Sequence, residues 1–562
     1  DGASFEVISP DLTRNDASKM GPSGGPITKD NTSVEYFGTI FAFAESPAQA
    51  GVLWAGSDDG LVQLSRDGGQ TWQNVTPPDL PEWALISIIE PSPHDAATAY
   101  VAATRYKLDD HAPYLYKTAD YGKTWTKIVT GIPENEFTRV IRADAARQGV
   151  LYAGTEKGVY VSFNDGAAWS PLQGNLPVVP IHDLALKDSD LIAATHGRSF
   201  WILDDVSPLH QLLDTPAEAG QPRLFAPRPT VRPTGGGRRP SPNPDYHRGY
   251  GNAGGFVVRT VQRTNAAGEP ELAFLDAGSN PPGGVVVQYY LPQKPDQPLT
   301  LRFRDAAGAL IKEFTSKPEE PEKKADETKD EHDKKEEPHP SVKAGLNRFV
   351  WNARYPDATD LKGVILWAGS LTGPLAPPGR YSVELAVGDT TQSVKFELVK
   401  DPRVAATQAE LEEQFTFLQQ IREKLSEAHA AIGQLRVARD QADAWAKRVK
   451  DGPHAEAIAT AARMLHDALT AVEEELIQPR SKAHEDPLNY PIKLNNKLAA
   501  LASVVASGDA APTRQSREVY ADLAAQTDRA LHRLQEVFAT ELDAFNTTVR
   551  DAAIPAIVAP EP

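Results

Sequence analysis

The chain has 562 residues, of which 40% are hydrophobic, and a formal net charge of −18, so it is long enough for several domains with buried cores. This acidic balance disfavours nucleic acid and anionic membrane surfaces as partners. The absence of cysteine excludes disulfides and thiol chemistry, and no apolar run approaches the ~20 residues of a membrane span.

An octapeptide of the form S-x-D-x-G-x-T-W recurs in the first third of the chain. It occurs as Ser65–Trp72, as Thr118–Trp125 and, in a relaxed form, as Ser162–Trp169. The Asp or Asn oxygen can accept backbone N–H groups within a turn, and the glycine supplies a positive φ. Each copy follows apolar runs, and the spacings of 53 and 44 residues between Trp72, Trp125 and Trp169 suit four-stranded sheets with variable loops. The pattern therefore predicts one tight hairpin turn per sheet.

This octapeptide resembles the Asp-box of sialidase-like and sortilin-like β-propellers. The resemblance implies that residues 1–205 form a partial propeller and that the Asp-box joins the two outer strands of each blade, away from the usual binding face. We therefore interpret Asp67, Asp120 and Asn164 as structural. The first strand of each blade is expected at four positions: 37–44, 83–89, 137–141 and 181–186. The fourth unit lacks the octapeptide and is interpreted as a closing blade.

The first residues of the chain look like the second half of another copy. Asp1–Phe5 aligns with Asp165–Trp169, and a hairpin needs both of its strands. We therefore expect upstream propeller blades, on a longer precursor or on a companion chain, as partners. Proteins of the family that this chain resembles are exported, which implies an extracytoplasmic location, periplasmic or secreted.

The remaining sequence predicts three further regions, so the fold class is multidomain, mainly β with an α-helical C-terminus. A connector is expected at 206–270, which includes the Gly/Pro-rich stretch 235–244. Alternating strands at 271–400 predict an immunoglobulin-like β-sandwich, with a disordered charged insertion at 317–339. Residues 403–550 change to a helical period and predict an antiparallel helical bundle that begins at a capping box. This order resembles the C-terminal part of large bacterial exported proteins described as sortilin-like or glycosyl-hydrolase-like.

The candidate ligand-binding residues come from two sets of propeller loops. Loops that lead into the first strand of each blade and loops that join its second and third strands share one face. These loops carry aromatic and cationic side chains: Tyr36, Trp83, Arg105, Tyr106, His182, His196 and Arg198. Aromatic rings can stack on a sugar, and arginines can hold an anionic group. For His196 and Arg198 the alternative interpretation is a bonded turn that locks the last blade.

Two functions remain open at the level of sequence. The first is a binding or scaffold protein that recognises a glycan, peptide or protein partner through the propeller face. The alternative is a glycoside hydrolase that acts on a polysaccharide, which needs two carboxylates ~5 to 9.5 Å apart. The catalytic candidates are the acidic residues of the same loops: Glu82, Glu136, Asp109 and Asp110. The sequence predicts no cofactor and no metal site.

Overall fold

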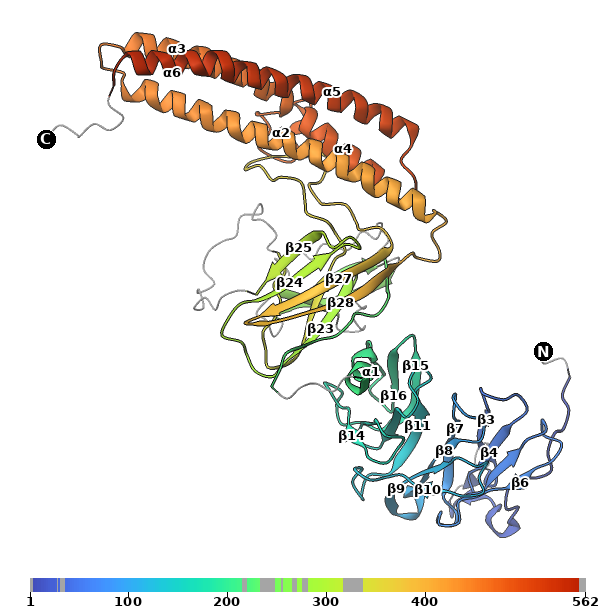
Figure 1. Cartoon of the computed structure of the whole chain (residues 1–562). Coiled ribbons are helices and arrows are strands. Elements are labelled where there is room, and N and C mark those ends of the chain that lie inside the picture. Colours follow the sequence, from blue (N-terminus) through green and yellow to red (C-terminus); the bar gives the residue numbers. More distant parts are fainter. Residues whose placement is uncertain are drawn as a thin grey trace. The chain divides into compact units, whose positions relative to one another are not determined.

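The computed structural model describes residues 4–27, 29–30, 36–214, 220–232, 248–253, 256–264, 270–274, 282–316 and 337–554. It divides into two compact units, Asp1–Pro216 and Ala217–Pro562. Figure 1 shows that strands make up most of the first unit, whereas the second unit contains both sheets and long helices. No helix among these residues is long and apolar enough to cross a membrane.

Four consecutive antiparallel sheets make up most of the first unit, and within each the strands lie in chain order. The first sheet contains β3 (Ile40–Glu45), β4 (Leu53–Ser57), β5 (Val62–Ser65) and β6 (Gln73–Asn74). The second contains β7 (Leu85–Pro91), β8 (Ala99–Arg105), β9 (Asp110–Thr118) and β10 (Thr126–Lys127). The third contains β11 (Thr138–Ala143), β12 (Leu151–Thr155), β13 (Val159–Ser162) and β14 (Ser170–Pro171). The fourth contains β15 (Ile181–Lys187), β16 (Asp190–Thr195) and β17 (Phe200–Leu203).

Each sheet packs against the next one along the chain. Strand β7 contacts β3 and β4, β11 contacts β7 and β8, and β15 contacts β11 and β12. The second strands β4 and β12 are buried at every position, and β8 at all but its last, because apolar side chains on both of their faces are covered. A series of meandering sheets with shared cores is a propeller-like arrangement.

The octapeptides form the turns between the third and fourth strands, where the repeat pattern predicts them. In the first turn, Asp67 accepts hydrogen bonds from the Thr71 amide (2.9 Å), the Thr71 hydroxyl (2.6 Å) and the Ser65 hydroxyl (2.8 Å). Asp120 accepts the same three kinds of bond in the second turn. Asn164 accepts two bonds in the third, because position 168 is alanine. The carboxyl or amide group therefore holds the turn closed, as expected of a structural residue.

The tryptophan of each turn contacts the segment that precedes its own sheet. The Trp125 indole donates to the Val75 carbonyl (2.7 Å), and the Trp169 indole donates to the Ile128 carbonyl (2.7 Å). Val75 follows β6 directly, and Ile128 follows β10 directly. These bonds join consecutive sheets at their outer strands. The Trp72 indole donates to the carbonyl of Ile8 (3.0 Å).

The β region of the second unit has two sheets that share one hydrophobic core. The three-stranded sheet has the order β18 (Arg223–Leu224), β23 (Val285–Leu291) and β26 (Gly345–Trp351). The five-stranded sheet has the order β19 (Thr230–Val231), β28 (Thr390–Val399), β27 (Gly379–Val387), β24 (Leu299–Arg304) and β25 (Leu310–Thr315). Alternate residues of β24 and β27 are buried, and Phe303 stacks on Trp351 across the core at 4.6 Å between ring centroids.

The predicted connector 206–270 differs from the structure. It contains α1 (Ser207–Asp214), the strands β18 and β19, and most of a three-stranded sheet formed by β20 (Arg248–Ala253), β21 (Phe256–Thr264) and β22 (Pro270–Phe274). Strands β18 and β19 are two residues long, too short for any period, and their partners β23 and β28 lie far along the chain. The stretch 235–244 and residues 317–336 of the predicted insertion lie outside the described residues.

The helices of the second unit share a second core. They are α2 (Gln408–Arg448), α3 (Ala455–Leu476), α4 (Leu494–Val505), α5 (Arg514–Val537), a π-helical turn η4 (Phe538–Leu542) and α6 (Asp543–Asp551). The predicted capping box is confirmed, since Thr407 and Glu410 exchange side chain to backbone bonds at the start of α2. The segment 352–378, which has no period in the sequence, lays Leu361, Leu366 and Leu371 against this core.

Candidate functional site

A cavity of about 260 Å³ lies among the loops of the first two sheets. Its lining residues come from the two predicted sets of loops and from the short helix η1 (Ala17–Lys19): Lys19, Phe37, Asp58, Trp83, Leu85, Thr104, Arg105, Tyr106, Lys107 and Leu108. Phe37 and Trp83 precede the first strands β3 and β7, whereas residues 105–108 join the second strand β8 to β9. The topology of the sheets therefore brings these loops to one place.

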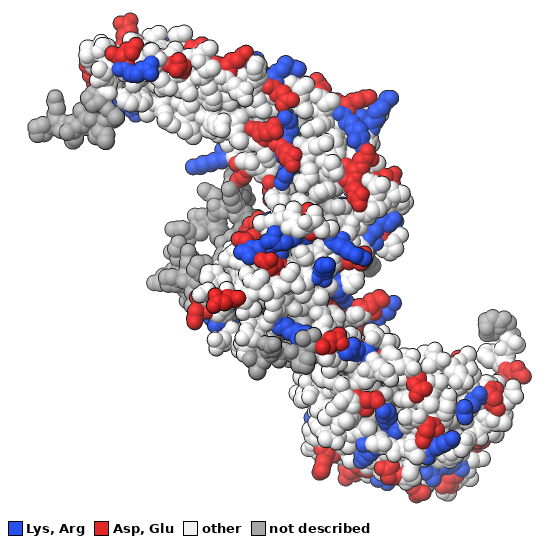
Figure 2. Space-filling view, viewed as in Figure 1, with Lys and Arg blue, Asp and Glu red and all other residues white. Residues whose placement is uncertain are grey.

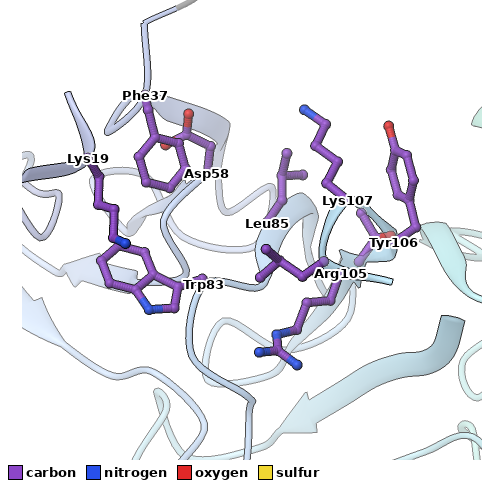
Figure 3. Close-up of a pocket in the computed structure, with 10 residues that line it drawn as sticks. Lys19, Phe37, Asp58, Trp83, Leu85, Arg105, Tyr106 and Lys107 are labelled. Atoms are coloured by element: carbon purple, nitrogen blue, oxygen red, sulfur yellow. The ribbon is translucent and has the colours of Figure 1, made fainter. Parts of the chain in front are cut away.

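Two aromatic rings form one side of the cavity. The ring centroids of Phe37 and Trp83 lie 6.0 Å apart. The Lys19 ammonium lies 5.7 Å from the Trp83 ring centroid, and the Arg14 guanidinium lies 5.0 Å from it. Figure 3 shows Lys19 and Phe37 beside Trp83, and Leu85 with Lys107 across the cavity from them. A cation close to an indole ring is attracted by the negative electrostatic potential of the ring face, so these two contacts stabilise the orientation of Trp83.

The second side of the cavity is cationic. Arg105 donates from Nε to the Glu82 carbonyl (2.9 Å) and from Nη1 to Asp110 (3.1 Å), which fixes its orientation. Lys107 is exposed in the short helix η2 (Tyr106–Leu108). The Tyr106 ring stacks on Phe137 at 4.9 Å between centroids. Three cationic side chains, Lys19, Arg105 and Lys107, thus border an aromatic wall.

Asp58 carries the single carboxylate among the described residues that line the cavity. It accepts hydrogen bonds from the backbone amides of Gly38 (3.0 Å) and Thr39 (2.8 Å), and from the Thr39 hydroxyl (3.1 Å). These bonds hold the loop before β3 against the loop after β4. The carboxylate therefore has a structural role in the cavity wall.

The four catalytic candidates do not come together at this cavity. The Glu82 side chain is 75% exposed beside Arg14, and the Asp109 side chain is fully exposed. Glu136 is buried and accepts a hydrogen bond from the Thr155 hydroxyl (2.5 Å). Asp110 accepts from Tyr114, Ala112 and Arg105. None of the four lines the cavity.

Asp110 is also in the wrong environment for a general acid. Its partial burial by itself raises the pKa of the carboxyl group, but hydrogen bonds from Tyr114, Ala112 and Arg105 outweigh burial and lower that pKa below its ordinary value. A glycosidase acid needs a raised pKa so that it holds its proton near neutral pH. Asp110 is therefore a bonded anion that orients Arg105.

Two predicted ligand residues form a histidine pair on the fourth sheet. His196 Nδ1 lies 3.1 Å from His182 Nε2, and their rings meet edge to face at 4.5 Å. Burial, with the charges of Arg139 and His196, lowers the pKa of His182. The backbone of Arg198 donates to the Thr195 hydroxyl and accepts from the Trp201 indole. The bonded turn is thus present, although both histidines remain exposed.

The structure brings together some predicted residues and adds others. Trp83, Arg105 and Tyr106 line the cavity, whereas Tyr36, His182, His196 and Arg198 do not. Phe37, Lys19 and Lys107 were not singled out by the sequence. Phe37 is the first residue of a predicted strand, and Lys107 directly follows Tyr106. Both therefore lie next to predicted ligand-binding residues. Lys19 lies in an N-terminal segment with no period. Among the described residues, no cluster of His, Asp and Glu could hold a metal ion.

No protein-family model and no curated protein matches the chain. Solved structures that match include YCF48 bound to a D1 peptide (19% identity, 29% of this chain, 51% of that chain, TM-score 0.24). A GH74 enzyme from Niastella koreensis also matches (14% identity, 65% of this chain, 47% of that chain, TM-score 0.23), as does a GH74 xyloglucanase from Xanthomonas campestris (17%, 42%, 38%, TM-score 0.24). Each match spans about half of the other chain or less. The description of the first unit as propeller-like depends on its own sheet order and packing.

Proposed function

We propose that this chain is an extracytoplasmic binding or scaffold protein whose propeller face recognises a peptide segment of a partner. The observation that carries this proposal is the cavity between the first two sheets, with its aromatic wall and three cationic side chains. Ligand pockets commonly combine apolar and aromatic side chains with a few polar groups that fix the orientation of the ligand. A segment with an apolar side chain next to an acidic one matches this chemistry.

The glycoside hydrolase alternative has less support from the geometry. That mechanism needs two carboxylates that face one another across the sugar, yet Glu82, Glu136, Asp109 and Asp110 are absent from the cavity lining. The single carboxylate there, Asp58, already accepts three hydrogen bonds. A sugar could still stack on Trp83 without being cleaved, so glycan binding is a second outcome of the test.

The test is binding of the complete chain to peptide and glycan arrays, beside hydrolysis assays on chromogenic glycosides. We expect acidic, apolar peptides to bind and no glycoside to be cleaved. Lys107→Glu should weaken peptide binding about tenfold because it reverses a charge at the cavity rim. Lys157→Glu is the matched control, since Lys157 is an exposed lysine on the corresponding loop of the third sheet and does not line the cavity.

The outcomes separate the two functions. Turnover that is lost in Glu82→Gln or Asp109→Asn would replace the binding proposal with the hydrolase. Glycan binding without peptide binding would keep the site and change the ligand. Equal effects of the lysine substitutions at 107 and 157 would show that the cavity is not where the ligand binds.

We also propose that the four sheets are part of a larger sortilin-like, Asp-box propeller completed by upstream blades. Supporting this, Ile8 meets the turn of the first sheet as Val75 and Ile128 meet the later turns. Its carbonyl accepts from the Trp72 indole (3.0 Å), and it lies against Gly69 as Val75 lies against Gly122. Ile8 follows Phe5 by three residues, as Val75 follows Trp72. Residues 5–8 thus lie at the position that the outer strand of a preceding sheet would occupy.

The outer faces of the end sheets support the same proposal. Phe41 and Phe43 on β3 are each 58% exposed, and Phe200 and Ile202 on β17 are 75% and 57% exposed. Alternate residues of a regularly paired strand share a face, so Phe200 and Ile202 lie on one face of their sheet. The pairing of β3 has a bulge between Ile40 and Ala42, which interrupts this alternation, so Phe41 and Phe43 are two exposed rings of one edge strand. An apolar face of this kind is suited to contact with another blade. Co-purification of the chain with polypeptide encoded upstream of it would test this arrangement.

For the second unit we propose that the two sheets form an immunoglobulin-like β-sandwich, which consists of strands from 271–400 together with β18 and β19, and that 403–550 forms an antiparallel helical bundle. The shared core of the two sheets and the mutual contacts of α2 with α3, α4 and α5 support these classes. Limited proteolysis followed by mass spectrometry would test the boundaries, because protease-sensitive sites concentrate in exposed linkers.

A further inference from the structure

A second cavity, of about 260 Å³, lies within the second unit between the segment 352–378 and the helices α2 and α4. Its charged lining residues are three arginines, Arg232, Arg354 and Arg422, and one carboxylate, that of Asp509, which binds Arg232. The lining also includes the uncharged polar residues Ser370, Thr372, Gln414 and Ser503. The chain as a whole has a net charge of −18. Three guanidinium groups at one cavity are therefore not a consequence of a basic composition.

Existing partners use only part of the hydrogen-bonding capacity of these arginines. Arg232 donates from Nη1 to Asp509 (2.5 Å) and from Nε to the Ala376 carbonyl (3.0 Å). Arg354 donates from Nη1 to the Gly373 carbonyl (2.9 Å). Each guanidinium has five N–H donors, so this bond uses only one of the donors of Arg354.

Arg422 provides the most direct sign of an anion-binding site. It donates to the Pro356 carbonyl (3.3 Å) and, at its exposed end, to Glu423 (3.2 Å). Its Nε is buried and has no hydrogen-bond partner in the described part of the chain. Buried polar groups are almost always paired, so an unpaired one in a cavity wall calls for an explanation such as a ligand.

The electrostatic environment of the arginines also favours an anion in this cavity. Burial lowers the pKa of Arg354, Asp357 opposes this effect, and the charge of Arg232 lowers that pKa further. Two guanidinium groups therefore repel one another in a partly desolvated place. A bound anion would relieve this repulsion and would be attracted more strongly than at the surface.

The rest of the cavity wall is apolar. Leu371, Leu418, Ile421 and Leu425 line it together with Ala502 of α4 and Ala506, which directly follows α4. A simple inorganic ion would leave these side chains without contacts. From the cationic groups and this wall together, we propose that the cavity binds a small organic anion, with a phosphate or carboxylate on the arginines and an apolar body against α2.

The test uses the complete chain with three probes at constant ionic strength: phenyl phosphate, phenylacetate and uncharged benzyl alcohol. Calorimetry should show saturable binding of at least one anion with one site per chain, and thermal melts should show a matching rise in melting temperature. Benzyl alcohol should bind at least about tenfold more weakly, because it lacks the charge-assisted bonds. The preferred anion distinguishes a phosphate from a carboxylate ligand.

Two matched substitutions locate the site. Arg422→Gln should weaken anion binding by about tenfold or more, whereas Arg463→Gln, which changes an exposed arginine of α3 outside the cavity, should leave it unchanged. Lys107→Glu in the first unit should also have no effect, which keeps this proposal separate from that for the propeller face. If Arg422→Gln loses its helical circular dichroism, Arg354→Gln provides the same comparison.

Three results would overturn the proposal. These are no saturable binding of either anion to the unmodified chain, equal binding of benzyl alcohol, and unchanged affinity in a folded Arg422→Gln or Arg354→Gln variant. The first two need no variant, so failure of a variant to fold does not protect the proposal.

Discussion

At the scale of single residues, one carboxyl or amide group determines each octapeptide turn. Hydrogen bonds from the Thr71 hydroxyl, the Thr71 amide and the Ser65 hydroxyl lower the pKa of Asp67 to about 2. The third turn keeps its shape with Asn164, which accepts from the Ala168 amide at 2.8 Å. A neutral acceptor is thus sufficient for this turn.

The first prediction follows from this comparison. Asp67→Asn should lower the melting temperature of the chain slightly, and Asp67→Ala should lower it more, because alanine leaves the Thr71 amide and hydroxyl without their acceptor. Gln70→Ala is the control, since the Gln70 side chain is exposed in the same turn. Thermal melts followed by near-ultraviolet circular dichroism would measure the order. Equal melting temperatures for the asparagine and alanine variants would contradict it.

Buried histidine provides a second prediction at this scale. His429 on α2 donates from Nδ1 to the Thr359 carbonyl (2.6 Å), and its Nε2 accepts from Asn495 (3.3 Å). Burial lowers the pKa of His429 from 6.5, the Thr359 bond and the charge of Asp360 oppose this, and Arg436 lowers it further. The unfolded chain therefore binds a proton at a higher pH than the folded chain does.

The stabilisation by neutral His429 is complete above the ordinary pKa of about 6.5 and is lost as pH falls through the lowered, folded pKa. The free energy of unfolding should therefore decrease between about pH 7.5 and pH 5.5. His429→Gln should flatten this dependence, and His532→Gln, at an exposed position on α5, should not. Denaturant titrations at a series of pH values, followed by helical circular dichroism, would measure the free energy of unfolding. If it has the same slope against pH in His429→Gln as in the unmodified chain, the prediction is wrong.

At the scale of elements, close packing of neighbouring sheets depends on glycine at the second strand. A Cβ atom on Gly56 of β4 would lie 2.4 Å from Cγ2 of Ile86 on β7. On β12, a Cβ atom on Gly154 would lie 2.7 Å from Ile181 of β15. The second strand of one sheet and the first strand of the next therefore touch where a side chain has no room.

The third prediction tests this contact. Gly56→Ala should destabilise the chain by about 1 to 3 kcal/mol because it overpacks the core. Ile86→Ala should cost about 2 to 5 kcal/mol, and the double variant should cost less than the sum because each change makes room for the other. Denaturant unfolding of the four proteins gives the coupling energy. If the destabilisation by the double variant equals the sum of the two single effects, the contact between Gly56 and Ile86 does not limit the packing of the two sheets.

At the scale of the whole molecule, charge is dispersed and apolar exposure is local. Figure 2 shows acidic and basic side chains interspersed over the visible surface of each unit. The net charge of −18 is thus not gathered into one acidic patch on this face. In contrast, β3 and β17 expose the apolar groups already described on the end sheets of the first unit.

The fourth prediction concerns these end sheets. The chain on its own should self-associate weakly, and Phe41→Ser with Phe43→Ser should reduce this association with little change in melting temperature, since both rings are 58% exposed and contribute little to the core. Tyr36→Ser removes a ring that is 68% exposed and lies outside the sheet, and this change should have no effect. Sedimentation velocity would measure association. A large loss of melting temperature would place the two rings in a core instead.

The repeat and the two periodicities predicted much of the architecture because each depends on neighbours in the sequence. The Asp67, Asp120 and Asn164 turns close on residues four positions away, and the capping box of Thr407 closes on Glu410. Strands β18 and β19 escaped prediction because two residues carry no period and their partners are distant. The segment 352–378 has no period either, and its Leu361, Leu366 and Leu371 pack against helices that follow it in the chain.

The sequence by itself determined the turn-forming octapeptides, the order of β and helical regions and the loops from which a site could be built, because these depend on local hydrogen bonds and on side-chain period. Only the tertiary structure decided which of those loops meet. It placed Lys19 and Phe37 beside Trp83, separated the four candidate carboxylates from the cavity, and gathered Arg232, Arg354 and Arg422 from three distant segments. Packing between sheets and helices joins residues across the chain, and no local pattern specifies that choice of partners.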